Sequence, residues 1–215
     1  MSGVLVVTGT DTGIGKTVVA AGLAAALGAH YWKPIQAGIV DGTDSQAAHA
    51  LGVTAARILP EAHRLALPAS PHLAAEAEGA SLDPDALALP AARPLVVEGA
   101  GGLMVPVRRA PPCLMIDLFA RWAAPVLLVA RTQLGTINHS LLSLAALRAA
   151  GVPIAGLLFV GEAHPDNEAI VPALGGVRCF GRLPRLDPLD AGALAGAMAA
   201  HVDLAGLRAA AGIAP

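Results

Sequence analysis

The stretch Thr8-Gly9-Thr10-Asp11-Thr12-Gly13-Ile14-Gly15-Lys16-Thr17 decides the fold of this chain. It follows an apolar run, Val4 to Val7, and precedes an alanine-rich helical pattern from Val18 to Leu27. A strand that stops at a glycine-rich turn and leads into a helix points successive backbone amides at one place, where they can bind polyphosphate. The stretch therefore predicts a phosphate-binding loop. A glycine-rich turn that binds no ligand is the plainer alternative.

The end of this loop carries the chemistry that a nucleotide site needs. Lys16 is expected to contact the terminal phosphates, and the Thr17 hydroxyl is expected to bind Mg2+. Five residues separate Gly9 from Gly15, one more than in the common form of the motif. The nucleotide contacts predicted in this stretch are Thr12, Gly13, Ile14, Gly15, Lys16, Thr17 and Val18.

Composition limits the classes of function. The 215 residues are 55% hydrophobic but only 3% aromatic, so small aliphatic side chains must fill the core, and the length suits one domain over residues 1–215. A net charge of −2 predicts no nucleic-acid or membrane partner. Met1-Ser2-Gly3 leads directly into the first strand without a signal peptide, and no apolar run reaches membrane-spanning length. We therefore expect a cytoplasmic protein that acts on small molecules.

The cysteines and histidines predict no metal centre of their own. Cys113 and Cys179 are far apart and have no Cys-x-x-Cys partner. They are expected to be reduced and buried. The seven histidines show no metal-binding spacing, so a zinc site is not expected.

A second lysine follows the next predicted strand, His30 to Trp32. Pro34 favours an extended backbone at Lys33, which places this lysine at the carboxyl end of a strand beside the phosphate loop. Open α/β sheets bind their ligands at that edge. Lys16 and Lys33 are also the only lysines among fourteen basic residues. An exposed lysine at the start of a loop is the alternative interpretation.

Two acidic residues are candidates to complete the site. Asp44 lies in a polar turn, residues 41–45, before a short helix predicted from Gln46 to Leu51, and it either caps that helix or lies near Mg2+. Glu98 ends a buried strand, Pro94 to Val97, and is followed by glycines. Because this strand ends at the same edge as the phosphate loop, a metal role is favoured over closure of a glycine turn.

The rest of the chain alternates between predicted helices and strands. Residues 52–93 are broken by prolines and are expected to lie over the sheet as short helices and loops, one of them starting at Ser70-Pro71. Helices are predicted at Met115–Trp122, Thr136–Ala150, Glu168–Leu174 and Ala191–Ala211, and strands at Pro125–Ala130, Ile154–Val160 and Val177–Phe180. Asn138 and His139, in the first turn of their helix, either cap it or contact a substrate.

This alternation predicts the fold class. Strand–helix–strand units give a mostly parallel sheet with right-handed crossovers and helices on both faces. With the phosphate loop at its first strand, the chain is expected to form a single-domain, three-layer α/β fold of the P-loop NTPase type.

Over nearly its whole length the chain resembles the dethiobiotin synthetase family. The resemblance is carried by the loop together with Lys33-Pro34-Ile35-Gln36-Ala37-Gly38, Ser70-Pro71-His72, Val97-Glu98-Gly99-Ala100-Gly101-Gly102 and Leu134-Gly135-Thr136-Ile137-Asn138-His139. It implies a homodimeric cyclo-ligase that uses ATP, Mg2+ and CO2 to convert 7,8-diaminopelargonate into dethiobiotin in biotin biosynthesis. A carbamate and a carbamic–phosphoric anhydride are the implied intermediates.

The resemblance also implies roles for individual residues. Lys16 and Lys33 would be catalytic, with Lys33 at the carbamate and the transferring phosphoryl group. Thr17, Asp44 and Glu98 would bind Mg2+. Lys33, Ala37 and Asn138 would bind the substrate. Nucleotide contacts outside the loop would come from Asp44, Glu98, Gly99, Ala100, Gly101, Val160, Gly161, Pro184, Arg185 and Leu186.

Two positions depart from the family pattern. The family usually has serine or threonine at the position of Ala37, so a hydroxyl contact to the substrate is missing. Many members have Asn-Asp, an adenine-reading pair, where this chain has Val160-Gly161. The sequence therefore leaves open whether ATP is preferred over other nucleoside triphosphates.

Two other functions share this architecture. A partition- or switch-type P-loop ATPase usually has an additional lysine early in the loop, where this chain has Thr10-Asp11-Thr12. An amide-forming synthetase of the cobyrinate type would need a glutaminase domain, for which 215 residues leave no room. The synthetase interpretation is therefore preferred, with the switch ATPase as the alternative.

Overall fold

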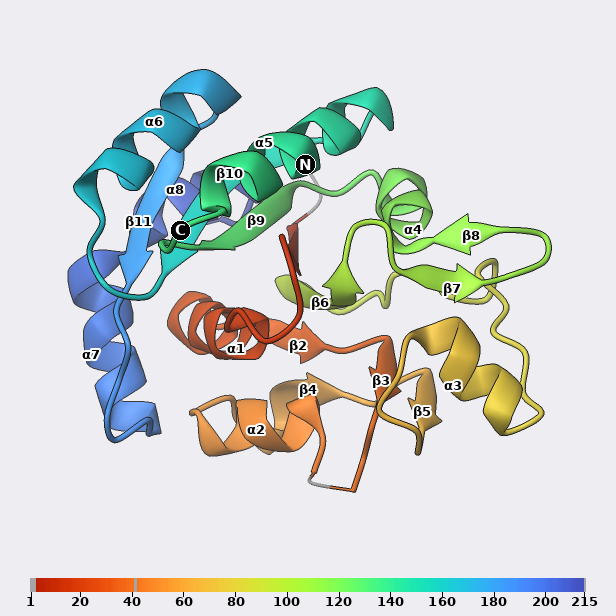
Figure 1. Cartoon of the computed structure of the whole chain (residues 1–215). Coiled ribbons are helices and arrows are strands. Elements are labelled where there is room, and N and C mark those ends of the chain that lie inside the picture. Colours follow the sequence, from red (N-terminus) through yellow and green to blue (C-terminus); the bar gives the residue numbers. More distant parts are fainter. Residues whose placement is uncertain (1–2, 41, 215) are drawn as a thin grey trace.

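The computed structural model describes residues 3–40 and 42–214. Within these residues a seven-stranded sheet has the strand order β11-β10-β9-β1-β6-β2-β4, and all of its strand pairs are parallel. Helices cover both faces of the sheet (Figure 1). The predicted α/β fold is thus confirmed. The expectations for Met1, Ser2 and Asp41 lie outside the described residues.

The elements have the following bounds. The main sheet consists of β1 (Val4–Gly9), β2 (His30–Trp32), β4 (Ile58–Leu59), β6 (Leu95–Gly102), β9 (Val126–Arg131), β10 (Ile154–Val160) and β11 (Cys179–Leu183). Two small pairs are β3 (Ile35–Ala37) with β5 (His63–Leu65), and β7 (Pro106–Arg108) with β8 (Cys113–Leu114). The helices are α1 (Lys16–Leu27), α2 (Asp44–Ala50), α3 (Pro71–Ala77), α4 (Met115–Trp122), α5 (Thr136–Ala149), α6 (Pro165–Gly175), α7 (Ala191–His201) and α8 (Leu204–Ala210), with a 3-10 turn at Ala55–Arg57.

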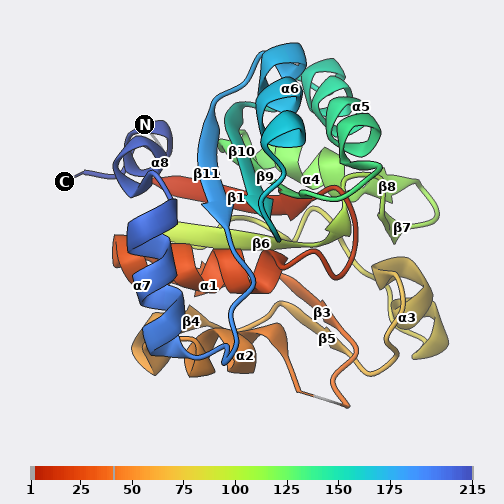
Figure 2. The same cartoon turned by 60° about the vertical axis from the view of Figure 1, so that its left-hand side comes forward.

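The central strand β1 divides its side chains between two cores. Leu5 and Val7 belong to a core shared with α1, α2, α7 and α8. Val4 and Val6 point to the opposite face and belong to a core that includes α4 and α5. This division follows from the two-residue period of a strand. Figure 2 shows the three resulting layers, with α5 and α6 on one side of the sheet and α1, α2 and α7 on the other.

The strand register brings the predicted site segments to one edge. Val7 of β1 lies opposite Glu98 of β6, and Trp32 of β2 lies opposite Val97. Because these strands are parallel, the chain leaves β1 and β2 at the same edge, where Glu98 also lies. The phosphate loop and Lys33 therefore start there, as the sequence predicted.

Three expectations about the fold were wrong in part. β6 does not end at Glu98 but continues to Gly102, which lies opposite Gly9. The segment 52–93 forms helices and loops but also supplies β4 to the edge of the main sheet and β5 to a small pair. These strands have only two and three residues, too few for a periodic pattern to reveal. Cys113 is buried, but Cys179 is only half-buried because β11 is an edge strand; both are free thiols.

The C-terminal helix expected at Ala191–Ala211 is two helices, α7 and α8. Val202 between them is extended and forms a β-bridge with Gly181. The Asp203 carboxylate accepts a hydrogen bond from the Gly206 amide at 2.8 Å and caps α8. A tertiary bridge and a local cap therefore interrupt an otherwise helical sequence. Among the described residues, no helix is both long and apolar enough to cross a membrane.

The bridge at Gly181 generates a stability prediction. Gly181 has a φ of +115°, and a Cβ there would overlap the backbone carbonyl oxygen of His201. Gly181→Ala should lower the free energy of unfolding by at least about 1–3 kcal/mol, because left-handed backbone strain adds to the overlap. Urea unfolding followed by circular dichroism measures this. Gly196→Ala, where a Cβ meets no atom within 4 Å, is the control and should be neutral or stabilising. Equal stability of the two variants would contradict the prediction.

Candidate active site

The phosphate loop is shaped by three glycines. Gly13 and Gly15 have φ values of +72° and +95°, a left-handed conformation that side chains disfavour. A Cβ on Gly9 would overlap the side chain of Ile14. Gly15 is the N-cap of α1 and no side chain caps this helix. The amides of its first turn are therefore available to an anion, and the helix dipole favours negative charge at this position.

The Lys16 side chain reaches back across the loop that precedes it and forms a hydrogen bond there. Its ammonium donates a hydrogen bond to the Asp11 backbone carbonyl at 2.7 Å, and the residue is 6% exposed. The Asp11 carboxylate accepts a hydrogen bond from the Thr12 amide and pairs with Arg131 at 2.8 Å. Burial, and next the charge of Lys33, lower the pKa of Lys16. An anionic ligand close to this ammonium would therefore relieve an unfavourable environment.

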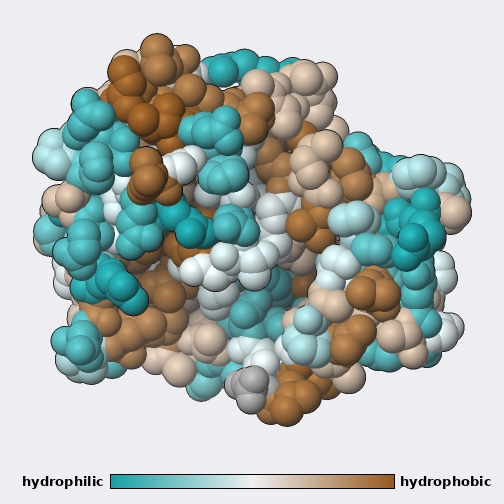
Figure 3. Space-filling view, viewed as in Figure 1, coloured by the Kyte–Doolittle hydropathy of each residue, from teal (hydrophilic) through white to brown (hydrophobic). Residues whose placement is uncertain are grey.

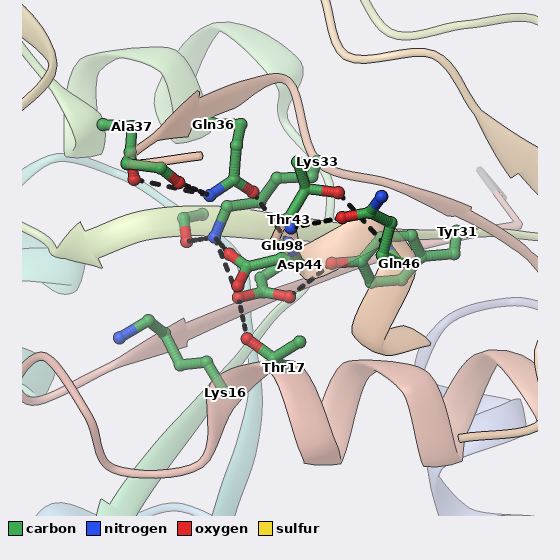
Figure 4. Close-up of polar contacts among 12 residues, drawn as sticks. Lys16, Thr17, Tyr31, Lys33, Gln36, Ala37, Thr43, Asp44, Gln46 and Glu98 are labelled. Atoms are coloured by element: carbon green, nitrogen blue, oxygen red, sulfur yellow. Dashed lines mark hydrogen bonds and ion pairs between the residues drawn. The ribbon is translucent and has the colours of Figure 1, made fainter. Parts of the chain in front are cut away.

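Lys33 lies between two carboxylates. Its ammonium is 2.6 Å from Asp44 Oδ2 and 2.9 Å from Glu98 Oε1, and it also donates to the Gly99 carbonyl at 3.3 Å (Figure 4). Lys33 is 5% exposed and Glu98 is 1% exposed. Burial acts to lower the pKa of Lys33, but the charges of Glu98 and Asp44 outweigh it and hold the pKa above its ordinary value. The interpretation of Lys33 as an exposed loop lysine is wrong.

Glu98 accepts hydrogen bonds from three side chains, those of Thr17, Tyr31 and Lys33. The Thr17 hydroxyl donates to Oε1 at 2.8 Å and the Tyr31 hydroxyl donates to Oε2 at 2.6 Å. Tyr31 was not among the residues predicted for the site. An available signal was its position two residues before Lys33, because alternate residues of an extended chain point to the same side. Burial, and next the charge of Glu98, raise the pKa of Tyr31 well above its ordinary value.

The position of Asp44 is set by its neighbours. Helix α2 starts at Asp44, earlier than expected, and its N-cap is Thr43, which forms a capping box with Gln46. The Asp44 amide donates to Gln36 Oε1 at 2.9 Å, a contact that the sequence analysis missed. Capping by Asp44 is therefore excluded. Its carboxylate is left to face Lys33.

The oxygen donors around Lys33 suit Mg2+. Thr17, Asp44 and Glu98 contribute one hydroxyl and two carboxylates, which are hard ligands of the kind that Mg2+ binds. Within residues 3–40 and 42–214, no three His, Cys, Asp or Glu side chains gather in a metal-binding arrangement. The donor set fits an ion that also keeps waters and phosphate oxygens as ligands, as Mg2+ usually does in nucleotide sites.

A cavity of about 510 Å³ lies on the α1 side of the loop. It brings together nine of the residues predicted to contact the nucleotide: Gly13, Ile14, Gly15, Val18, Val160, Gly161, Pro184, Arg185 and Leu186. Arg131 and Gln133 also line it and were not predicted. A Cβ on Gly161 would come within 2.8 Å of the Thr132 hydroxyl at a φ of +129°. A larger residue would be strained at Gly161 in this backbone.

A second cavity, of about 440 Å³, lies beside Lys33. Its lining includes Thr12, Ala37, Ala100 and Gly101, all predicted site residues, and also Ser70-Pro71 from the proline-rich segment. Figure 3 shows the face of Figure 1 hollowed between α1 and β3, with pale or hydrophilic residues there. Lys33 lines this cavity and also donates a hydrogen bond to Glu98. A ligand bound in the cavity would therefore contact the buried ammonium.

Asn138 stands apart from both cavities. It is exposed in the first turn of α5 and lines neither of them. Gly135 is the N-cap of α5 and no side chain caps the helix, so the capping interpretation of Asn138 and His139 is wrong. His139 lines a different cavity, of about 370 Å³, together with Met104 and Leu142.

Comparisons of the sequence with known proteins find a matching family model and relatives similar over nearly the whole chain. A family model described as an AAA domain matches residues 3–193. The ATP-dependent dethiobiotin synthetase BioD of Rhodopseudomonas palustris (strain TIE-1) is 60% identical over 202 residues, which cover 93% of this chain and 94% of that protein. The protein of the same name from Brucella anthropi is 53% identical over 206 residues, covering 95% and 96%.

Similarity to solved structures supports the fold alone. A ParA family ATPase from Chlorobium tepidum TLS has a TM-score of 0.54 at 11% identity, covering 94% of this chain and 90% of that one. The MinC:MinD cell division protein complex of Aquifex aeolicus has a TM-score of 0.50 at 12% identity, covering 99% and 97%. These structures share the overall fold of this chain.

The buried ion pair predicts a stability effect. Lys33→Met leaves Glu98 buried without its cation and should lower the free energy of unfolding by roughly 3–5 kcal/mol at neutral pH. Because the folded-state pKa of Lys33 is raised, the stabilisation is present below the unfolded-state pKa of about 10.4 and is lost as the pH rises through the folded-state value. Urea unfolding at several pH values measures both effects.

The matched control is the double variant Lys33→Met/Glu98→Gln. It removes both charges, so it should recover part of the lost stability. If Lys33→Met is as stable as the parent at neutral pH, the ion pair does not hold these segments together.

Proposed function

The chain belongs to the dethiobiotin synthetase family, and we infer that it is an ATP-dependent ligase that forms dethiobiotin in biotin biosynthesis. The carrying observation is the buried Lys33 ammonium, which lies between two carboxylates and also lines a cavity beside the phosphate loop. The proposed substrates are 7,8-diaminopelargonate, CO2 and a nucleoside triphosphate. The predicted site residues would act within one domain spanning residues 1–215.

The proposed reaction has three steps. One substrate amine attacks CO2 and loses a proton, which gives a carbamate. A carbamate oxygen then attacks the γ-phosphorus, the bond to the β,γ-bridging oxygen breaks, and ADP leaves. The second amine attacks the carbonyl carbon of the mixed anhydride, loses a proton and expels phosphate, which closes the cyclic urea. The protein must mainly align the reactants and offset negative charge, because phosphoryl transfer depends on both.

Each lysine has a distinct part in this proposal. Lys16 contacts the β- and γ-phosphates, which gives its buried ammonium an anionic partner. Lys33 contacts the carbamate and the transferring phosphoryl group from the wall of the second cavity. Two ammonium groups lower the repulsion between an anionic carbamate and the triphosphate. Thr17, Asp44 and Glu98 would hold Mg2+, which supplies further neutralisation of phosphate charge when bound.

The second cavity is proposed to hold the diamine. Ala37 contributes no hydroxyl to this cavity, but Thr12 and Ser70 line it as well. Ser70 Oγ is 3.0 Å from His72 Nδ1, which orients one of the two hydroxyls. We assign to Thr12 and Ser70 the polar contacts that a hydroxyl at the Ala37 position would otherwise provide.

The nucleotide is proposed to be held mainly by its phosphates. Among the residues that line the first cavity, Val160 and Gly161 present no side-chain donor or acceptor to a base. A site distinguishes strongly between ligands when the wrong ligand leaves polar groups of the site without hydrogen-bond partners. Val160 and Gly161 have no polar side-chain group that could distinguish bases in this way. We therefore propose that GTP and CTP are accepted alongside ATP.

A homodimer is part of the proposal. Leu134 is 99% exposed, and Met104 and Leu142 are each 62% exposed, which is costly for an isolated chain. All three lie near the start of α5 or line the cavity beside it. A second copy covering this face would bring an exposed Asn138 to the substrate of its partner. We place the protein in the cytoplasm, with small molecules rather than nucleic acid as partners.

The switch-ATPase alternative is not favoured. Its structural basis is the likeness to ParA and MinD, which at 11% and 12% identity concerns only the fold. Sequence identity of 53–60% over nearly the whole chain connects it to dethiobiotin synthetases instead. Lys16 is also the only lysine of the phosphate loop.

Product formation tests the function directly. Purified protein is incubated with 7,8-diaminopelargonate, bicarbonate and Mg2+, with ATP, GTP or CTP in parallel, and products are measured by mass spectrometry. We expect dethiobiotin with all three nucleotides, at rates within about tenfold of each other, because one missing base contact is worth about 1–1.5 kcal/mol. Lys16→Met should form no detectable product. Its control is Arg64→Met, which changes an exposed cation outside both cavities.

Absence of dethiobiotin with every nucleotide, from folded protein, would refute the proposed reaction. Dethiobiotin with ATP alone would instead refute only the relaxed base preference.

The dimer proposal predicts the effect of a surface charge. Leu134→Glu should convert a dimer into a monomer, measured by light scattering after size-exclusion chromatography, because a carboxylate would be buried without a partner. The monomeric Leu134→Glu variant should remain folded and keep its thermal stability. Leu174→Glu on α6, where the parent leucine is 63% exposed, is the control and should stay dimeric. A parent protein that is monomeric at micromolar concentration would count against the proposal.

A further inference from the structure

Tyr31 is the single tyrosine of the chain and has no contact with either main cavity. Its side chain is completely buried, and its hydroxyl donates to Glu98 Oε2 at 2.6 Å. Figure 4 shows the phenol pointing from β2 toward the carboxylate, on the side away from Lys33. Tyr31 therefore contacts Glu98 from the side opposite Lys33.

The two oxygens of Glu98 have separate partners. Oε1 accepts from the Thr17 hydroxyl at 2.8 Å and from the Lys33 ammonium at 2.9 Å. Oε2 accepts from Tyr31. Because a carboxylate can rotate about its last bond and bind a metal through either oxygen or both, this division selects Oε1 as the oxygen that faces the phosphate loop.

The phenol is rigidly placed. Tyr31 lies opposite Ile58 of β4 and Val96 of β6, so strands on both sides hold its backbone. Its ring belongs to the core that also contains Leu23 and Leu27 of α1. A side chain fixed in this way can orient a carboxylate without adjusting to it.

We propose that Tyr31 is a positioning residue for the metal site. It engages Oε2 and so presents Glu98 to Mg2+ through Oε1 alone, beside the Thr17 hydroxyl. This inference rests on the proposed role of Glu98 as a Mg2+ ligand. Residues that orient a metal ligand commonly affect metal affinity about 10–100-fold when they are removed.

A purely structural role makes a different prediction. Buried carboxylates need hydrogen-bond donors, and Tyr31 could serve only that need. In that case, loss of the hydroxyl would lower stability and leave the metal dependence of nucleotide binding unchanged. The two roles therefore differ in a quantity that can be measured without substrate or turnover.

The test is the Mg2+ dependence of nucleotide binding by Tyr31→Phe. Binding of the β,γ-imido analogue of ATP is measured by calorimetry over a range of Mg2+ concentrations and without Mg2+. The variant should need about 10–100-fold more Mg2+ for half of the metal-dependent gain in affinity. Its affinity without Mg2+ should equal that of the parent, because the ring and the phosphate loop are retained.

Trp32→Phe is the matched control. Trp32 is the neighbouring residue of β2, is 4% exposed, and donates one hydrogen bond from Nε1 to the Pro60 carbonyl. It belongs to the core on the opposite face of the sheet. Its replacement should lower stability and leave the Mg2+ dependence as in the parent. An unchanged Mg2+ dependence in Tyr31→Phe, or the same shift in Trp32→Phe, would overturn the proposal.

A measurement on the parent protein covers the case in which Tyr31→Phe fails to fold. With Cζ-labelled tyrosine the chain gives one phenol carbon signal, because it has one tyrosine. Adding Mg2+ to the nucleotide-bound protein should shift this signal, since a metal on Oε1 weakens the acceptor at Oε2. An unmoved signal while Mg2+ tightens nucleotide binding would contradict the inference.

These measurements use neither diamine nor CO2, so they separate this inference from the proposed reaction. If Mg2+ has no effect on nucleotide binding by the parent, the metal role of Glu98 and this inference both fail. Dethiobiotin formation is assayed independently and could fail while the Tyr31 inference holds.

Discussion

A lysine ammonium buried between two carboxylates connects the segments that build this site. Lys33 follows β2, Glu98 lies in β6 and Asp44 begins α2, and the three side chains meet within 2.6–2.9 Å. A buried charge is costly unless it is paired and hydrogen-bonded. Lys33 and Glu98, which are both buried, therefore depend on each other and on the parallel register that brings the two strand ends together. The phosphate loop lies at the same edge, so this requirement also fixes the carboxylates relative to Thr17.

The two lysines of the chain lie in opposite electrostatic environments. Carboxylates raise the pKa of Lys33, whereas burial and the charge of Lys33 lower that of Lys16. Among the described residues, Lys33 pairs with two carboxylates, whereas Lys16 donates a hydrogen bond to a backbone carbonyl. In the proposed function a triphosphate would be the anionic partner of Lys16, whereas the protein itself supplies the carboxylate partners of Lys33.

Packing limits which side chains fit at Gly161, in the lining of the first cavity. Gly161 has a left-handed backbone and lies against Thr132, so a larger residue would not fit without rearrangement. The neighbouring Val160 also packs close to Gly15 of the phosphate loop. Close packing of this strand end therefore gives a structural reason for a glycine at position 161.

The sequence alone determined the α/β fold, the loop from Gly9 to Thr17, and the segments that contribute Lys33 and Glu98. These features depend on local patterns: apolar strands, glycine turns, and a proline after Lys33. Only the tertiary structure decided that Asp44 pairs with Lys33 rather than capping α2, that Tyr31 reaches Glu98, and that the C-terminal helix breaks at Val202. These outcomes arise from contacts between residues far apart in sequence, whose positions depend on how the strands and helices pack.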